Sequence, residues 1–287
     1  STLVEAAPGV LLAAWFGGTA EGAKDVQIWL SRFAGGTWSP PEVVGTEPGQ
    51  PCWNPVLFRP SVGEWPLSLW YKAGPSPQTW TGFVRTSDDA GKTWSKPTML
   101  PAGFYGPVRA KPVQLTDGTV LAGTSVESYR CWTPFADRST DGGRTWMRSN
   151  AYPAATGHDQ IQPTVFEAAD GTVVALTRSR KPLKVHRAAS TDGGKTFSAS
   201  EPTDLGNPSS GIDAVRTKDG DVFLIYNPTG VGRTPLSLAR STDDGKTWAK
   251  VHDLETEPGE YSYPAMIEGS KGTLEITYTW RRTHVKH

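Results

Sequence analysis

One octet recurs along the chain, and its spacing constrains the fold more than any other feature. The pattern Ser-x-Asp-x-Gly-x-Thr-Trp/Phe occurs at 87–94, 139–146, 190–197 and 241–248, and a fifth copy at 31–38 has Phe33 in place of the aspartate. From each Ser to the next, the steps are 56, 52, 51 and 51 residues. A nearly constant period of this length predicts a repeat architecture with one supersecondary unit per repeat.

The residues of the octet are those of a tight hairpin turn. Asp and Ser side chains bond nearby backbone amides, Gly supplies a positive φ, and the final aromatic buries a large apolar surface. A catalytic reading of the Asp and Ser needs a partnered base, and the repeat supplies none. We therefore interpret the octets as structural turn staples.

Each octet follows short alternating strands separated by turns, as in Pro112–Gln114, the turn Thr116-Asp-Gly118, and Thr119–Gly123. Units of four short strands repeated every 40 to 50 residues are typical of propeller blades. Blade openings fall at Ser1, Asn54, Lys111, Gln162, Asp213 and Tyr263. The sequence thus predicts an all-β, six-bladed β-propeller with Asp-box turns, in which residues 1–287 form one domain. A sixth octet would fall beyond His287, so the last blade is expected to lack its outer strand, and residues before Ser1 are expected to supply it.

Composition excludes several partners. The 29 Lys and Arg balance the 29 Asp and Glu, so no net charge attracts nucleic acid or an anionic membrane. The longest apolar run, Val10–Phe16, is too short to span a bilayer. We expect a soluble monomer, secreted or periplasmic if a signal segment was removed ahead of Ser1. Cys52 and Cys131 are expected to be free thiols, and the five histidines, His158 among them, have no metal-ligand spacing.

In a propeller, the starts of the inner strands and the loops between second and third strands meet at one central mouth. The openings bring Trp53, Asn54, Arg109, Lys111, Gln160, Gln162, Asp213, Tyr261 and Tyr263, and the loops bring Glu21, Asp25, Lys72, Glu127, Arg178, Arg180, Asn227, Arg233, Arg281 and Arg282. Arginine gathered in a concave site suits a planar carboxylate, which the guanidinium fork binds through both oxygens. Several of these arginines could instead be solvated or paired with neighbouring acids, with Arg178 and Arg233 the stronger candidates.

The octets resemble the Asp-boxes, or BNR repeats, of the sialidase (neuraminidase) superfamily, and the resemblance covers the whole chain. Three segments carry it more specifically, namely Leu176–Ser179, Tyr226–Arg233 and Gly259–Ser262. The tail, residues 261–265 followed by 276–282, is most similar to bacterial sialidase-like BNR proteins. The resemblance implies that Arg178 and Arg233 hold the substrate carboxylate and that Tyr261 is the nucleophile. Tyr263 is the alternative nucleophile, since the register of that strand is ambiguous by two residues.

The same resemblance places the acid/base in the first-blade loop, at Asp25 or Glu21, with Asp25 closer to the sialidase frame. The first substrate arginine of sialidases would precede Ser1. Gln162 stands where sialidases have the glutamate that partners the nucleophile, and an amide cannot accept a phenolic proton. Glu260, Glu127 or Asp213 could replace that base. Further candidates for substrate binding are Lys111, Asn54, Lys72, Asp213, Tyr263 and Arg281.

The function that this implies is a retaining exo-glycosidase with a tyrosine nucleophile, acting on an acidic terminal sugar of an oligosaccharide or glycoconjugate without a metal or other cofactor. Two alternatives stay open. One is another acidic-glycan enzyme, either a polysaccharide lyase or a rhamnose–uronate hydrolase, which the amide at Gln162 favours. The other is a non-catalytic glycan-binding propeller.

Overall fold

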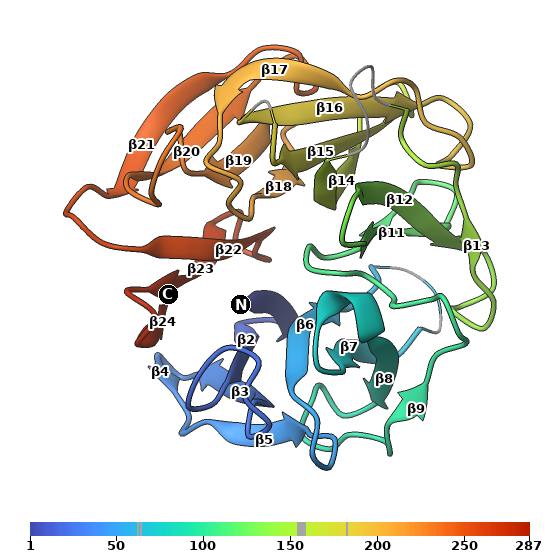
Figure 1. Ribbon diagram of the computed structural model, residues 1–287, viewed down its shortest axis with the longest axis vertical. Coiled ribbons are helices and arrows are strands. Elements are labelled where there is room, and N and C mark those ends of the chain that lie inside the picture. The colour runs from blue at the N-terminus through green and yellow to red at the C-terminus, as the bar shows by residue number, and fades with distance from the viewer. Residues whose placement is uncertain (62, 64, 154–158, 182) are drawn as a thin grey trace.

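Six antiparallel sheets are arranged around a central axis in the computed structural model of the chain, which describes residues 1–61, 63, 65–153, 159–181 and 183–287 (Figure 1). Four sheets have four strands, the first has five and the last has three. The prediction of an all-β, six-bladed propeller is confirmed. The described residues include one short 3-10 helix, η1 (Pro77–Thr79), and none of their helices is long and apolar enough to cross a membrane.

The strands follow one another blade by blade, from the axis outward. They are β1 (Thr2–Ala7), β2 (Val10–Gly17), β3 (Gln27–Ala34), β4 (Thr37–Trp38) and β5 (Glu42–Gly45); β6 (Cys52–Phe58), β7 (Leu67–Ala73), β8 (Thr81–Ser87) and β9 (Thr98–Met99); β10 (Val113–Gln114), β11 (Val120–Glu127), β12 (Trp132–Ser139) and β13 (Met147–Arg148); β14 (Gln160–Glu167), β15 (Val173–Ser179), β16 (Lys184–Ser190) and β17 (Glu201–Gly206); β18 (Asp213–Arg216), β19 (Val222–Tyr226), β20 (Leu236–Ser241) and β21 (Ala249–Glu255); β22 (Tyr261–Glu268), β23 (Leu274–Trp280) and β24 (His284–Lys286).

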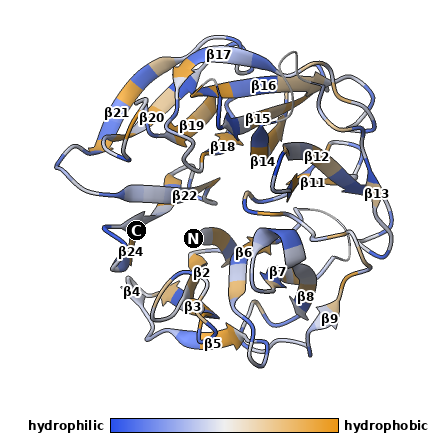
Figure 2. Ribbon diagram, viewed as in Figure 1, coloured by the Kyte–Doolittle hydropathy of each residue, from blue (hydrophilic) through white to orange (hydrophobic). Residues whose placement is uncertain are grey.

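The core lies between neighbouring blades. Apolar and polar residues alternate along many of the strands, as the orange and blue bands of Figure 2 show, so each sheet can present apolar side chains to its neighbour. Between the first two blades, Leu12, Leu57 and Leu69 are fully buried in one cluster. Cys52 is buried in the same cluster, and among the described residues neither it nor Cys131 forms a disulfide, as predicted.

The octets form the expected staples. In the second blade, the Asp89 carboxylate accepts hydrogen bonds from the Thr93 hydroxyl (2.6 Å), the Thr93 and Lys92 amides and the Ser87 hydroxyl. The Ser87 oxygen in turn accepts from the Gly91 amide at 2.8 Å. Hydrogen bonds to the charged form hold the pKa of Asp89 well below its usual value. These bonds occupy both oxygens of the carboxylate, so the aspartate of the octet stabilises the turn.

Successive blades are joined by a recurring polar contact. An acidic or amide side chain near the end of one inner strand accepts hydrogen bonds from a turn of the preceding blade, in the pairs Gln114–Ser61, Glu167–Thr116, Glu268–Lys218 and Glu5–Ser270. The last pair joins blade one to blade six with two distances of 2.7 Å. The same device that links neighbouring blades therefore also closes the ring.

Blade six has three strands and β1 is the inner strand of blade one, both as predicted. The N-terminus lies near the centre of the ring in Figure 1, where the Ser1 nitrogen is 3.3 Å from the Tyr263 carbonyl oxygen. That residues before Ser1 complete blade six stays a prediction.

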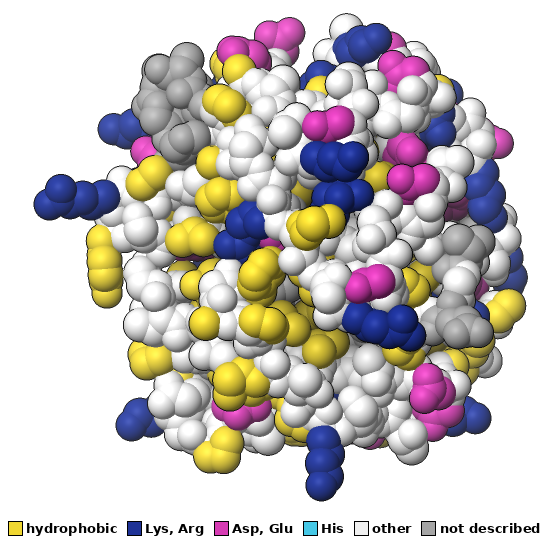
Figure 3. Space-filling view, turned by 90° about the vertical axis from the view of Figure 1, so that its right-hand side faces the viewer, with side chains coloured by type: hydrophobic (Ala, Val, Ile, Leu, Met, Phe, Trp, Pro, Cys, Tyr) yellow, Lys and Arg dark blue, Asp and Glu magenta, His cyan; other side chains and the backbone are white. Residues whose placement is uncertain are grey.

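On the side that carries β9 and β13, apolar side chains gather in the middle of the face among charged ones (Figure 3). Met99 and Met147 lie on these two strands and are largely exposed. In the same two blades, Trp146 packs edge-on against Trp65 and Trp70. The seam between blades two and three is thus rich in aromatic side chains.

Candidate active site

Three inner strands begin with the same irregularity. Asn54, Gln162 and Tyr263 each precede a proline and have positive φ values of 40°, 56° and 49°. At each of them the pairing with the second strand shifts register. A bulge of this kind adds one residue to the strand and re-aims the side chain, and strained backbone of this kind gathers at functional sites. The three bulges surround the central mouth.

The bulge in β22 separates the two candidate tyrosines. Tyr261 is 0% exposed and packs with Ile225, Leu236 and Met266 in the core between blades five and six. Its hydroxyl accepts a bond from Arg281 Nε at 3.3 Å. The expectation that Tyr261 faces the mouth is therefore corrected. In a regular strand it would share a face with Tyr263, but the bulge between them breaks the alternation.

Tyr263 borders a pocket of about 290 Å³ between the β2–β3 loop of blade one and the start of blade six. The pocket is lined by Ser1, Trp15, Phe16, Gly17, Gly18, Thr19, Ala20, Glu21, Val26, Glu260, Ser262, Tyr263, Thr279 and Arg282. Its wall thus combines aromatic side chains with a phenol, two carboxylates and a guanidinium. That mixture is characteristic of a site that binds a polar ligand with apolar faces.

The two candidate acids of blade one occupy different positions. Asp25 accepts hydrogen bonds from the Thr19 amide and hydroxyl, both at 3.0 Å, and braces the β2–β3 loop. Glu21 lines the pocket and forms an ion pair of 3.2 Å with Arg282. The resemblance favours Asp25, whereas the geometry places Glu21 at the pocket wall.

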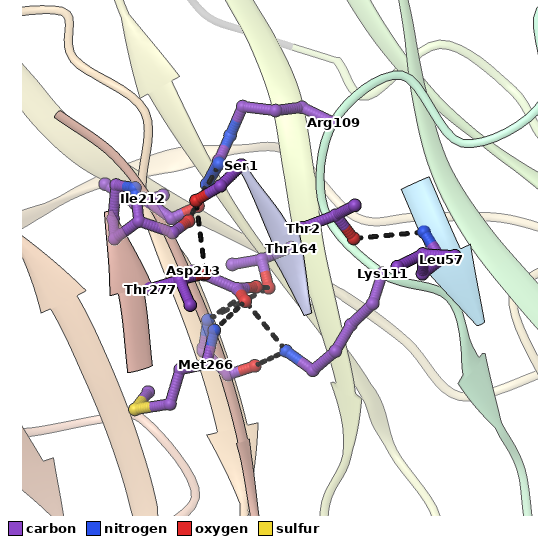
Figure 4. A network of polar contacts seen from close by, with 12 residues as sticks. Ser1, Thr2, Leu57, Arg109, Lys111, Thr164, Ile212, Asp213, Met266 and Thr277 are labelled. Carbon is purple, nitrogen blue, oxygen red and sulfur yellow. Dashed lines mark hydrogen bonds and ion pairs between the residues drawn. The ribbon is translucent and has the colours of Figure 1, made fainter. Parts of the chain in front are cut away.

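Asp213 lies at the base of the mouth and is 2% exposed (Figure 4). Its carboxylate accepts hydrogen bonds from the Thr164 hydroxyl (2.9 Å), the Met266 amide (2.8 Å), its neighbour's amide at Ala214 (3.1 Å) and Lys111 Nζ (3.0 Å). These partners come from blades three, four, five and six. Asp213 and Lys111 were both expected to bind substrate. The structure instead joins them in an ion pair that links blades three and five.

Arg109 crosses the mouth from the entry of blade three. It donates to the Pro264 carbonyl oxygen from both terminal nitrogens (2.9 and 3.0 Å) and to the Ile212 carbonyl, and it is 4% exposed. Burial lowers the pKa of Arg109 to about 10, against the opposing effect of Asp213. Sequence reasoning placed Arg109 among the opening residues without giving it a role. Its position two residues before Lys111 was the available signal.

Arg178 and Arg233 both lie at the mouth. Arg178 is 7% exposed, donates to the Ser209 carbonyl oxygen at 3.1 Å, and lies 5.9 Å from the centre of the Trp132 ring. Arg233 lies 5.2 Å from the centre of the Tyr263 ring and forms an ion pair of 2.8 Å with Glu260. The segment before blade five contacts both Arg109 and Arg178, because Arg178 donates to the Ser209 carbonyl oxygen and Arg109 to the Ile212 carbonyl oxygen.

Lys72 does not reach the mouth surface. It is 0% exposed, and its ammonium donates to the backbone carbonyls of Asn54 (3.2 Å), Val108 (3.3 Å) and Pro107. Burial lowers the pKa of Lys72 well below its usual value. The expectation that Lys72 binds substrate is corrected, since the side chain holds the Asn54 bulge to blade three. Arg281, another substrate-binding candidate, stacks 4.7 Å above Trp280 at the edge of blade six.

Gln162 is 4% exposed, and its Oε1 has no hydrogen-bond partner among the described residues. Glu127 lies at the end of β11, the strand of blade three that packs against β14. Burial raises the pKa of Glu127, and Arg178 and Gln162 offset part of this rise. Glu127 is thus the mouth carboxyl group whose proton affinity its surroundings increase.

Among the described residues, no group of three or more His, Cys, Asp and Glu side chains could hold a metal ion. His158 lies outside the described residues.

The fold and the mouth define an Asp-box propeller with a cationic centre. The BNR repeat-like domain family matches residues 9–276, and the chain belongs to that family. A sialidase of Bacteroides fragilis (strain YCH46) is 26% identical over 309 aligned positions, which cover 91% of this chain and 55% of that protein. The chain therefore spans about half the length of this curated relative.

Solved structures share the fold. A Hadza microbial sialidase superposes with a TM-score of 0.78 at 19% identity, over 99% of this chain and 63% of that one. A protein of unknown function from Dyadobacter fermentans DSM 18053 gives a TM-score of 0.77 at 20% identity, over 95% of this chain and 87% of that one. Their likeness extends the family's propeller fold to essentially the whole chain.

Proposed function

We propose that this protein is a sialidase-type glycoside hydrolase that removes a terminal sugar bearing a carboxylate, at the mouth of the propeller. The observation that carries the proposal is the pair of buried guanidiniums, Arg109 and Arg178, each with an Nε that has no partner among the described residues. The two positive charges act on each other, since Arg178 lowers the pKa of Arg109. A bound carboxylate would relieve this repulsion and supply charge-assisted hydrogen bonds.

The pocket at the start of blade six supplies two reacting groups. Tyr263 and Glu21 line the same cavity, and Arg233 lies over the Tyr263 ring. A phenol suits an anionic substrate because, unlike a carboxylate nucleophile, a neutral hydroxyl does not repel the sugar's own charge. In this proposal the Tyr263 oxygen attacks the anomeric carbon and gives its proton to the Glu260 carboxylate, which lines the same pocket, while the Glu21 carboxyl group protonates the departing oxygen. Glu21 then takes a proton from the water that releases the sugar, and Glu260 returns the proton to Tyr263.

The amide at Gln162 supports a second candidate function on the same mouth. A lyase that acts on a uronate must neutralise the carboxylate of the sugar, and Arg178 together with an amide donor can do this. It also needs a base that removes the proton from the carbon next to that carboxylate. Tyr263 would be that base. This reaction does not need a carboxylate at position 162.

Mass spectrometry of products from a panel of sialosides and uronate-containing oligosaccharides separates these functions. A hydrolase releases an acidic sugar that has gained one water, a lyase gives an unsaturated sugar without added water, and a binding module gives no product. We expect Tyr263→Phe to abolish release, and Tyr129→Phe, at a side chain that is 85% exposed, to retain it. Full activity of Tyr263→Phe would refute the assigned nucleophile.

A further inference from the structure

Arg282 joins the two carboxyl groups that transfer protons in the proposed mechanism. Its Nε lies 2.8 Å from Glu260 Oε2, and its Nη1 lies 3.2 Å from Glu21 Oε2. All three side chains line the pocket that Tyr263 borders. One arginine therefore connects the blade-one loop that carries Glu21 to the entry of blade six, beside the cavity in which the sugar is proposed to react.

The two carboxyl groups depend on Arg282 to different degrees. Glu260 also accepts hydrogen bonds from Arg233 at 2.8 Å and from the Ser262 hydroxyl at 3.1 Å. For the Glu21 carboxyl group, the contact with Arg282 is the one side-chain hydrogen bond within the described part of the chain. Arg233 and Glu260 therefore anchor Arg282, and Arg282 in turn sets the position of Glu21.

Arg282 is held in an unfavourable backbone conformation. It follows Arg281 in the turn between β23 and β24, which the Thr283 amide closes by donating to the Trp280 carbonyl oxygen at 3.0 Å. The two arginines have φ values of 51° and 56°, in the left-handed region. A turn with positive φ at both central residues favours Asn and Gly, and strained residues of this kind gather at functional sites. The turn itself gives no reason for an arginine at position 282, whereas the two carboxyl groups do.

The contact with Arg282 is compatible with a proton on Glu21. The guanidinium donates to Oε2 alone, and this oxygen can accept the bond whether or not Oε1 carries a proton. The side chains of Arg282 and Glu21 are 53% and 41% exposed, so solvent screens their attraction. Arg282 can therefore orient the carboxyl group without keeping it ionised.

We propose that Arg282 is a positioning residue, which holds Glu21 at the pocket so that its carboxyl group meets the oxygen that leaves the sugar. The inference rests on the proposed glycosidase function and deepens it, because it names the residue that aims the acid. Arg282 acts through Glu21 in the transition state, whereas Arg109 and Arg178 hold the sugar carboxylate in the proposed function. Removing Arg282 should therefore lower kcat and leave KM nearly unchanged.

Kinetics with two kinds of leaving group test this role. The probes are the para-nitrophenyl and methyl α-glycosides of N-acetylneuraminic acid and the para-nitrophenyl and methyl β-glycosides of D-glucuronic acid. A nitrophenolate leaves without being protonated, whereas methanol needs the acid. We expect Arg282→Gly to lower kcat by about 10–100-fold for methyl glycosides and by about threefold or less for nitrophenyl glycosides. Arg282→Lys should recover much of the loss, since its ammonium group can still donate to Glu21.

A double variant tests whether Arg282 acts through Glu21. Glu21→Gln should show the same preference for nitrophenyl glycosides. Adding Arg282→Gly to Glu21→Gln should cause little further loss, because both changes remove the same interaction.

Urea unfolding separates positioning from a structural role. The unfolding midpoint of Arg282→Gly should equal or exceed that of wild type, since glycine relieves the positive φ and the lost ion pairs are exposed. The matched control is Asp244→Gly, which removes the ion-pair partner of Arg216 from another turn position with a φ of 56°. This control should keep the wild-type kcat for every probe.

The outcomes separate the role of Arg282 from the function itself. Equal losses for both leaving groups, independent effects of Arg282→Gly and Glu21→Gln, or an unchanged kcat in Arg282→Gly would overturn this role and leave the proposed function standing. If wild type hydrolyses none of the probes, the role of Arg282 falls together with the proposed function.

Discussion

Replacing Asp213 with alanine should destabilise the propeller more than any exposed charge does. The side chain is 2% exposed and accepts bonds from Lys111, Thr164, Ala214 and Met266, so its loss leaves buried donors from four blades without their acceptor. Removing one member of a buried ion pair costs about 3–5 kcal/mol. We expect a loss in this range, at its lower end because Lys111 is 18% exposed and keeps the Ala214 carbonyl.

The assay is equilibrium unfolding in urea, followed by tryptophan fluorescence, with the change taken from the midpoint at constant slope. Asp221→Ala is the matched control, because its ion pair with Arg240 is open to solvent, with the two side chains 22% and 47% exposed, and is expected to contribute about 0–1 kcal/mol. If the two variants lie within about 1 kcal/mol of each other, then Asp213 is not the tie described above.

Three further predictions concern the turns and the mouth. Hydrogen bonds in the fourth-blade octet lower the pKa of Asp192 to about 2. The ionised carboxylate therefore stabilises the fold above the pKa that Asp has in the unfolded chain, and this stabilisation is lost as the pH falls toward about 2. Between these two pH values the melting temperature of Asp192→Ala should fall less steeply than that of wild type. Gly194→Ala should cost about 2–4 kcal/mol in urea unfolding, because its φ is +79° and a Cβ would lie 2.5 Å from a leucine carbon of β11, whereas Gly9→Ala, with a φ of +73° and open space, should cost about 1–2 kcal/mol. Arg178→Ala should weaken binding of acidic methyl glycosides by about 2–4 kcal/mol in calorimetry, and Arg240→Ala should not; equal affinities would show that the anion site lies elsewhere.

The fold could be predicted because its determinants are local and periodic. Each octet forms its turn from its own Ser, Asp, Gly and Thr, so Asp89 and its hydrogen bonds are readable from eight residues. The spacing of the octets then gives the number of blades. Neither step requires knowledge of which blades are neighbours in space.

The site could be predicted only in part, because its side chains depend on contacts between blades. Lys72 and Asp213 are charged residues at mouth positions in the sequence. Only the folded structure shows that Lys72 donates to backbone carbonyls and that Asp213 accepts from Lys111. Tyr263, at the bulge, has a positive φ although it is not a glycine, so the residue type does not indicate this backbone conformation. The sequence signal for these bulges is the proline that directly follows Asn54, Gln162 and Tyr263.

Trapping the protein with an activated fluoro-sugar tests the central claim most directly. The probe is a difluorinated acidic sugar that forms the covalent intermediate quickly and hydrolyses slowly, and the labelled peptide is mapped by mass spectrometry. The account predicts one adduct on Tyr263, absent in Tyr263→Phe and unchanged in Tyr261→Phe. An adduct on Tyr261 or on a carboxylate, or turnover of acidic sugars by Tyr263→Phe at the wild-type rate, would contradict it.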